Sequence, residues 1–129
     1  MKRKSWILVL ACVCLVGMSC QNNKKNTPEA VTEAFAKAFY TADFAHLYQY
    51  TTKKSQPVVQ TIQNGMKGNE ARLEEMKNSK VEFVEVKVIE QTDSTALCGC
   101  EVKINEQPRS DRWDLVKEDN EWKVTLVVL

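Results

Sequence analysis

Residues 113–126 read WDLVKEDNEWKVTL, and they carry the clearest structural signal in the chain. At its centre, Asp119 and Asn120 form the polar dipeptide that is typical of a two-residue hairpin loop. Such a loop sets three pairs of residues opposite each other, namely Lys117 with Trp122, Leu115 with Val124, and Trp113 with Leu126. Every apolar member of these pairs falls on the same face, and this agreement determines the register. The stretch therefore predicts two antiparallel strands with one apolar face.

Two further strands precede this hairpin. Val84, Val86 and Val88 alternate with charged residues, which is the period of a strand. After a polar turn at residues 91–94, the apolar residues of the next strand share one face: Ala96, Cys98, Cys100, Val102 and Ile104. We expect residues 105–110, which include Pro108, to form a loop. The order of the strands predicts a four-strand antiparallel meander.

The first half of the chain carries helical patterns. Thr27, Pro28 and Glu29 predict a helix start, with a hydroxyl cap, proline at the first position and an acid in the first turn. Apolar residues then recur at three- and four-residue steps: Val31, Ala34, Phe35, Ala38 and Phe39. Asp43 is expected to cap a short second helix, and residues 58–66 and 73–76 predict two more. Helices followed by a sheet indicate an α+β fold in which the helices cover one sheet face.

Composition narrows the class of protein. A chain of 129 residues with 43% hydrophobic residues is sufficient for one domain with one core. The 18 basic residues nearly balance the 17 acidic ones, which argues against nucleic acid as a partner. With one histidine and no second cluster of cysteine and histidine, we expect no metal and no cofactor.

Residues 1–19 have the features of an export signal. A basic start at residues 2–4 is followed by an apolar run from Trp6 to Val16. This run is shorter than the about 20 residues that span a bilayer and suits the core of a signal peptide. Cys20 follows the small Ser19 and resembles the acylated cysteine of a bacterial lipoprotein lipobox, although Gly17 replaces the usual Leu or Val.

That resemblance implies cleavage before Cys20 and anchoring in membrane lipid through acyl chains on this residue, palmitate among them. Residues 20–26 would then form a polar tether. Plain secretion with a free Cys20 thiol is the alternative. Surface-exported lipoproteins of Bacteroidetes-type bacteria usually carry acidic residues soon after the cysteine, whereas here the first acid is Glu29. The resemblance therefore implies the periplasmic face of the outer membrane.

Residues 27–129 resemble the nuclear-transport-factor-2-like superfamily. The resemblance rests on the order of three features: the helix start at Pro28 and Glu29, the helix opened by Asp43, and the closing hairpin at residues 115–124. With the export signal included, the chain resembles small lipoproteins of unknown function from Bacteroidetes-type bacteria. The resemblance to the superfamily implies a curved sheet wrapped around helices, a cystatin-like cone with a pocket, and a possible homodimer through the sheet. The superfamily includes isomerases, dehydratases and inactive binding domains, so the fold does not give the function.

Two groups of residues invite a chemical hypothesis. His46, the single histidine, and Asp43 are the candidates for acid–base catalysis, although capping of a helix accounts for Asp43 equally well. Cys98 and Cys100 lie two residues apart on one strand, so their Cα atoms are about 6.6 Å apart, near the upper limit for a disulfide. Gly99 would permit the necessary distortion, whereas alignment with apolar neighbours suggests two small core residues. Thiol catalysis is a third alternative.

Four aromatic residues are candidates for lining a cone pocket or filling the core, namely Tyr40, Tyr48, Trp113 and Trp122. Alternating charges of both signs suggest a solvated sheet face: Arg109, Asp111, Arg112, Asp114, Glu121 and Lys123. The sequence thus favours a lipid-anchored periplasmic domain that binds a small ligand or a partner protein without catalysis. A small isomerase- or hydrolase-type enzyme, or a structural accessory subunit of an envelope complex, are the alternatives.

Overall fold

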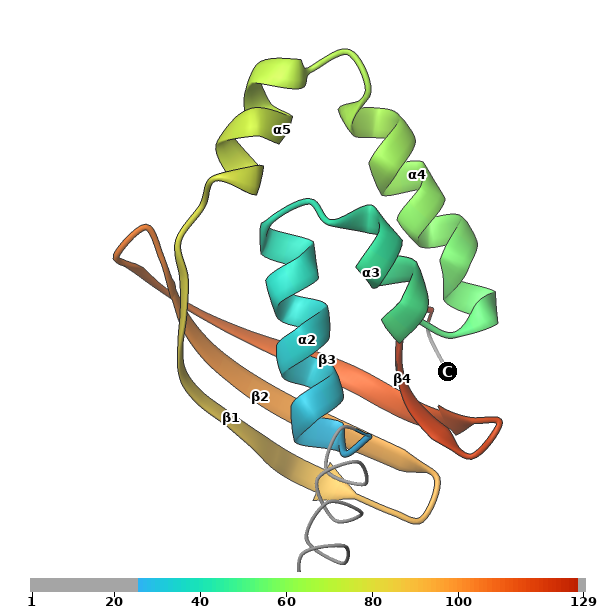
Figure 1. Ribbon diagram of the computed structural model, residues 1–129. Coiled ribbons are helices and arrows are strands. Elements are labelled where there is room, and N and C mark those ends of the chain that lie inside the picture. The colour runs from blue at the N-terminus through green and yellow to red at the C-terminus, as the bar shows by residue number, and fades with distance from the viewer. Residues whose placement is uncertain (1–25, 128–129) are drawn as a thin grey trace, which may run out of the picture.

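The computed structural model describes residues 26–127 (Figure 1). The expected signal peptide, Cys20 and almost all of the tether lie outside the described residues. The elements in chain order are α2 (Pro28–Tyr40), α3 (Phe44–Tyr50), the 3-10 helix η1 (Lys53–Ser55), α4 (Gln56–Met66), α5 (Glu70–Lys77), β1 (Val81–Gln91), β2 (Thr95–Ile104), β3 (Gln107–Glu118) and β4 (Glu121–Thr125). Within this part of the chain, no helix is long and apolar enough to cross a membrane.

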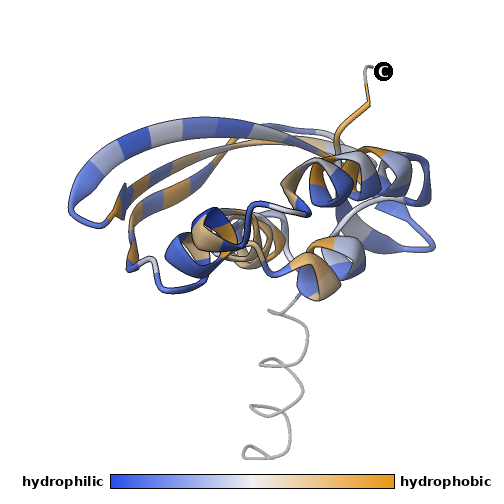
Figure 2. Cartoon of the chain, turned by 90° about the horizontal axis from the view of Figure 1, so that it is seen from above, coloured by the Kyte–Doolittle hydropathy of each residue, from blue (hydrophilic) through white to orange (hydrophobic). Residues whose placement is uncertain are grey.

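The strands form one antiparallel sheet in the order β1-β2-β3-β4, and the helices lie on one side of it (Figure 2). This confirms the predicted α+β fold with a four-strand meander. Below, the face that packs against the helices is called the inner face, and the opposite face is called the outer face.

Local capping determines where the first two helices begin. The Thr27 hydroxyl accepts a hydrogen bond from the Ala30 N–H at 3.2 Å, and Pro28 occupies the first turn of α2. The Asp43 carboxylate caps α3 in the same way, by accepting from the His46 N–H. Side-chain oxygens satisfy backbone donors that have no partner inside a helix, which is why such residues start helices.

The core lies between α2 and the inner face. Phe35 is fully buried on α2, and its ring meets the edge of Trp113 with the ring centroids 4.8 Å apart. Leu115 and Val124, opposite each other on β3 and β4, are buried beside it. Aromatic and aliphatic side chains from a helix and a sheet therefore fill the interior, as an amphipathic helix on a one-sided sheet requires.

The closing hairpin has the predicted register. Asp119 and Asn120 have φ values of 52° and 65°, the left-handed conformation of a type I′ turn. Lys117 lies opposite Trp122, and the ladder ends where Asp114 faces Thr125. The expected third pair is absent from this ladder, because the chain leaves β3 one residue later, at Leu126.

The expected loop at residues 105–110 was wrong. Only Asn105 and Glu106 form the turn, both with positive φ, and β3 begins at Gln107. Pro108 is accommodated because β4 does not extend to this half of β3, so no neighbouring strand in the described part of the chain needs the missing N–H of the proline.

The alternation expected along β1 was wrong at Val84. A register shift between Phe83 and Glu85 marks a bulge, and Phe83 takes the inward position opposite Val102. Val84 is therefore 60% exposed, whereas Val86 and Val88 face the buried cysteines of β2.

Candidate functional site

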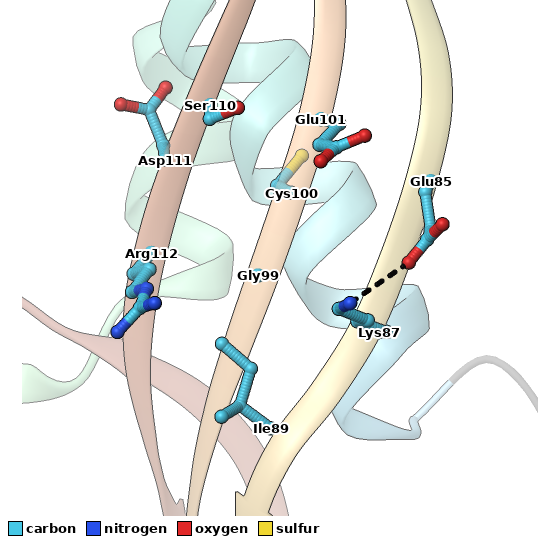
Figure 3. A pocket seen from close by; sticks show the side chains of 9 residues that line it. All are labelled: Glu85, Lys87, Ile89, Gly99, Cys100, Glu101, Ser110, Asp111 and Arg112. Atoms are coloured by element: carbon cyan, nitrogen blue, oxygen red, sulfur yellow. Dashed lines mark ion pairs between the residues drawn. The ribbon is translucent and has the colours of Figure 1, made fainter.

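A groove crosses the outer face of the sheet, on the side away from the helices (Figure 3). Its volume is about 490 Å³. Residues of three neighbouring strands line it: Glu85, Lys87, Ile89, Gly99, Cys100, Glu101, Ser110, Asp111 and Arg112. We call this feature the Gly99 groove.

The groove is hollow because its centre lacks a side chain. The strand register places Gly99 between Lys87 on β1 and Arg112 on β3. Neighbouring strands lie about 4.8 Å apart, so side chains at three adjacent positions would normally close over one another. A Cβ on Gly99 would lie 3.2 Å from Ile89 Cδ1, a distance that would force the isoleucine to move. The glycine therefore keeps the floor of the groove open.

The walls carry charges of both signs. Lys87 Nζ lies 3.3 Å from Glu85 Oε1, so these two charges largely satisfy each other. Arg112 and Glu101 form no ion pair within residues 26–127, and both side chains are exposed. A guanidinium on β3 and a carboxylate on the central strand β2 are thus available to a bound molecule in the groove.

Sequence reasoning missed this groove. The only role that the sequence suggests for Gly99 is to ease a disulfide, although a glycine inside a strand is also a sign of a close approach or an open surface. The charged residues that line the groove come from three strands. Without the register of these strands, the sequence does not show that they lie side by side.

The structure corrects the expected position of two of the charged residues. Asp111 lies opposite Cys100, and Arg109 lies opposite Val102. Opposite residues share a face, so both charges are on the inner side, where the Arg109 guanidinium lies 5.2 Å from the centre of the Tyr40 ring. Burial raises the pKa of the Asp111 carboxyl above its usual range. The expectation failed because residues 105–110 were expected to form a loop, so the alternation of side chains along β3 could not be extended back to Arg109 and Asp111.

Asp43 and His46 meet on the surface at the start of α3. Asp43 Oδ2 lies 2.6 Å from His46 Nδ1, and Oδ1 caps the helix by accepting the His46 N–H. The two side chains are 44% and 57% exposed, and the imidazole stacks on Tyr50 with the ring centroids 6.5 Å apart. Helix capping accounts for this pair, which lies on the helix side of the sheet, whereas the groove lies on the outer face.

Cys98 and Cys100 are buried free thiols on the inner face of β2. Burial raises the pKa of both thiols, that of Cys100 to about 11. The thiolate is the reactive form, so these environments suppress nucleophilic chemistry. Both side chains lie among the apolar residues of the core. Within residues 26–127, no three side chains of His, Cys, Asp or Glu gather as a metal site would need.

The four aromatic candidates divide between core and surface. Trp122 and Tyr40 are 6% and 5% exposed, and Trp113 packs on two phenylalanines of α2. Tyr48 is half-buried and donates a hydrogen bond to Gln63 at 3.1 Å. The Tyr40 hydroxyl and the Trp113 Nε1 are buried polar atoms without a partner in the described part of the chain.

Comparison with known proteins supplies the family. The model of a family described as a domain of unknown function, DUF4878, matches residues 18–125. The chain belongs to this family. The DUF4878 match includes all the helices and strands described above. No curated protein has a matching sequence.

A solved structure supports the predicted fold. The chain is similar to a Campylobacter jejuni protein described as NTF2-like and named provisionally as a transpeptidase, with a TM-score of 0.54 and 21% identity over 78% of this chain and 99% of that one. A SEC-C motif-containing protein from Rhodopseudomonas palustris has a TM-score of 0.48 and 16% identity, over 77% and 75% of the two chains. The first likeness shows that this DUF4878 domain has an NTF2-like fold.

Proposed function

We propose that this protein is a lipid-anchored, non-enzymatic binding protein of the bacterial cell envelope, and that the Gly99 groove holds its ligand. The observation that carries the proposal is the groove itself. Its volume of about 490 Å³ lies within the range of about 300–1,000 Å³ that is usual for small-molecule sites. The enzymatic alternative has less support, because Asp43 and His46 form an exposed helix cap.

The charges of the groove suggest the class of ligand. A guanidinium binds a carboxylate through two parallel hydrogen bonds, and Arg112 has no such partner within the described residues. Glu101 offers the opposite charge to an amine, while Lys87 is already paired with Glu85. A small molecule that carries both a carboxylate and an amine, such as an amino acid or a dipeptide, complements this arrangement.

Chemical-shift mapping with the dipeptide Ala-Ala tests the groove. Acetate and ethylamine, which each carry one of the two charges, serve as comparison probes. We expect Ala-Ala to perturb the amide signals of groove residues more strongly than either comparison probe.

Two variants make this test specific. Arg112→Gln removes the guanidinium, and Gly99→Val fills the floor of the groove. Each variant should therefore lower the apparent affinity for Ala-Ala at least tenfold. Lys103→Gln, also on the outer face but outside the lining, is the matched control and should bind as the wild type does. Absence of binding, or equal binding by the Arg112 variant, would refute the assignment of the groove.

The anchor and the location rest on the first residues of the chain. The apolar segment, Ser19 before Cys20 and the following polar residues support lipidation of the type found in Bacteroidetes lipoproteins. The absence of acids between Cys20 and Glu29 supports the periplasmic face of the outer membrane.

The intact mass of protein from native membranes tests the anchor. We expect residues 20–129 plus two or three acyl chains, and no acylation in a Cys20→Ser variant. An unmodified wild-type mass contradicts lipid anchoring. Protease added to cells tests the location. We expect a periplasmic domain to resist digestion in intact cells and to be digested once the outer membrane is opened. Digestion in intact cells contradicts the periplasmic location.

A further inference from the structure

The first half of β3 has an open edge. β4 pairs with β3 only along residues 114–118, so no strand within residues 26–127 covers residues 107–113 on that side. The chain leaves this edge at Leu126, whose N–H donates to the Ser55 hydroxyl at 2.8 Å. The edge is therefore open because the end of β4 binds the segment between α3 and α4.

The backbone groups on this edge follow from the alternation of hydrogen bonds along a strand. The Lys117 N–H donates to the Ser94 carbonyl, on the β2 side of β3, at 2.9 Å. Successive residues of a strand direct these groups to opposite sides. Even-numbered residues therefore point toward the open side, and within residues 107–113 these are Pro108, Ser110 and Arg112. Each except proline offers both a donor and an acceptor.

The side chains along this edge are self-complementary. Arg109, Ser110 and Asp111 place a positive and a negative charge on either side of a small residue. When two such segments run antiparallel with Ser110 facing itself, Arg109 of each copy lies opposite Asp111 of the other. Opposite charges at facing positions stabilise a pair of strands, and like charges destabilise it. A register centred on Asp111 would instead set two carboxylates against each other.

The same register satisfies the backbone. The two facing Ser110 residues exchange a pair of hydrogen bonds, and each Arg112 N–H meets the Pro108 carbonyl of the other copy. The missing N–H of Pro108 limits the pairing to this short central segment. The other open edge, along β1, is interrupted by register shifts after Phe83 and after Val88 and is less suited to pairing.

From these features we propose that two copies of this chain pair through the open edge of β3, antiparallel and centred on Ser110. The sheets of the two copies then form one continuous sheet, with the two Gly99 grooves next to each other on its outer face. The pairing does not depend on the proposed ligand, because the side chains that direct it, Arg109 and Asp111, are not the ones assigned to the ligand.

A cysteine at the symmetry centre tests the pairing in the full chain in its native membrane. Facing residues in a hydrogen-bonded pair have Cα atoms about 5.5 Å apart, which suits a disulfide. We expect Ser110→Cys to form a covalent dimer under mild oxidation, at a level at least tenfold above that of the wild type. Glu101→Cys, on the same face but one strand further in, is the matched control and should form no covalent dimer above the level of the wild type. Equal cross-linking of both variants, or of neither, overturns the proposal.

A charge exchange in the Ser110→Cys background tests the register. Arg109→Asp makes the segment wholly acidic, and Asp111→Arg makes it wholly basic, so neither variant should cross-link with itself. When the two variants are produced together with different tags, their charges are complementary, and we expect cross-linking between them to recover. This recovery also shows that both variants are folded. Within one chain, Arg109 Nε lies 3.3 Å from Asp111 Oδ2, but this internal ion pair cannot produce cross-linking between two different variants. Failure to recover, or cross-linking of either variant with itself, overturns the register.

Discussion

High pH should destabilise this protein through Cys100. The side chain is 2% exposed, and burial raises the pKa of its thiol from 9.0 to about 11. Burial also raises the pKa of Cys98. The neutral thiol is thus favoured in the folded protein, whereas the unfolded chain releases the proton more readily. The contribution to stability is complete below about pH 9 and is lost as the pH rises toward 11.

The rise in the pKa of Cys100 sets the size of the effect. Each pKa unit corresponds to about 1.36 kcal/mol, so a rise of about two units amounts to at most about 2.7 kcal/mol of unfolding free energy. This is a large fraction of the about 5–15 kcal/mol that stabilises a typical domain. Cys98 adds a contribution of the same sign.

Urea unfolding, followed by tryptophan fluorescence under reducing conditions, measures this loss. Wild type and Cys100→Ala are compared at about pH 8 and about pH 11. The substitution leaves a small cavity at both pH values, and lysines and tyrosines titrate in both proteins. Each protein loses some unfolding free energy between the two pH values, and the difference between these losses isolates the contribution of the Cys100 thiol. We expect the wild type to lose more stability by about 1–2.7 kcal/mol. Equal losses would refute the reasoning that a buried neutral thiol supports the fold.

Other substitutions test the core, the turn and the cap. Leu115→Ala, at a residue 1% exposed, should lower the unfolding free energy by about 2–5 kcal/mol in urea titration, and a loss below 1 kcal/mol contradicts the core assignment. Asn120→Gly, at a φ of 65°, should raise the free energy of unfolding by up to about 1 kcal/mol, whereas a decrease contradicts the type I′ turn. Asp43→Ala should cost about 1 kcal/mol through the lost cap, and His46→Ala should cost less, because its pair with Asp43 is exposed. The reverse order in thermal melts would contradict the capping role.

Sequence patterns that act over a few residues predicted the elements well. The Thr27 hydroxyl and the Asp43 carboxylate start helices because they reach backbone donors within the next turn. Asp119 and Asn120 close a hairpin because polar residues tolerate a positive φ. These local rules, together with the order of helices and strands, led to the α+β fold and to the NTF2-like resemblance.

The same patterns gave wrong predictions where a shift of one residue changed which side chains of a strand face the core. The bulge beside Val84 turned an expected core residue outward, and the early start of β3 moved Arg109 and Asp111 to the inner face. Because side chains alternate with a period of two, an error of one residue reverses the face of every later residue.

The sequence alone was therefore sufficient to predict most of the helices and strands, the hairpin register and the family of folds, since short-range hydrogen bonds and alternation encode them. Tertiary structure alone decided the Gly99 groove and the open edge of β3. The groove needs Lys87, Gly99 and Arg112 side by side, and they come from three strands. The edge is open because Leu126 bonds to Ser55, 71 positions earlier in the chain. Contacts between distant segments depend on the packing of the whole domain, and no local pattern carries that information.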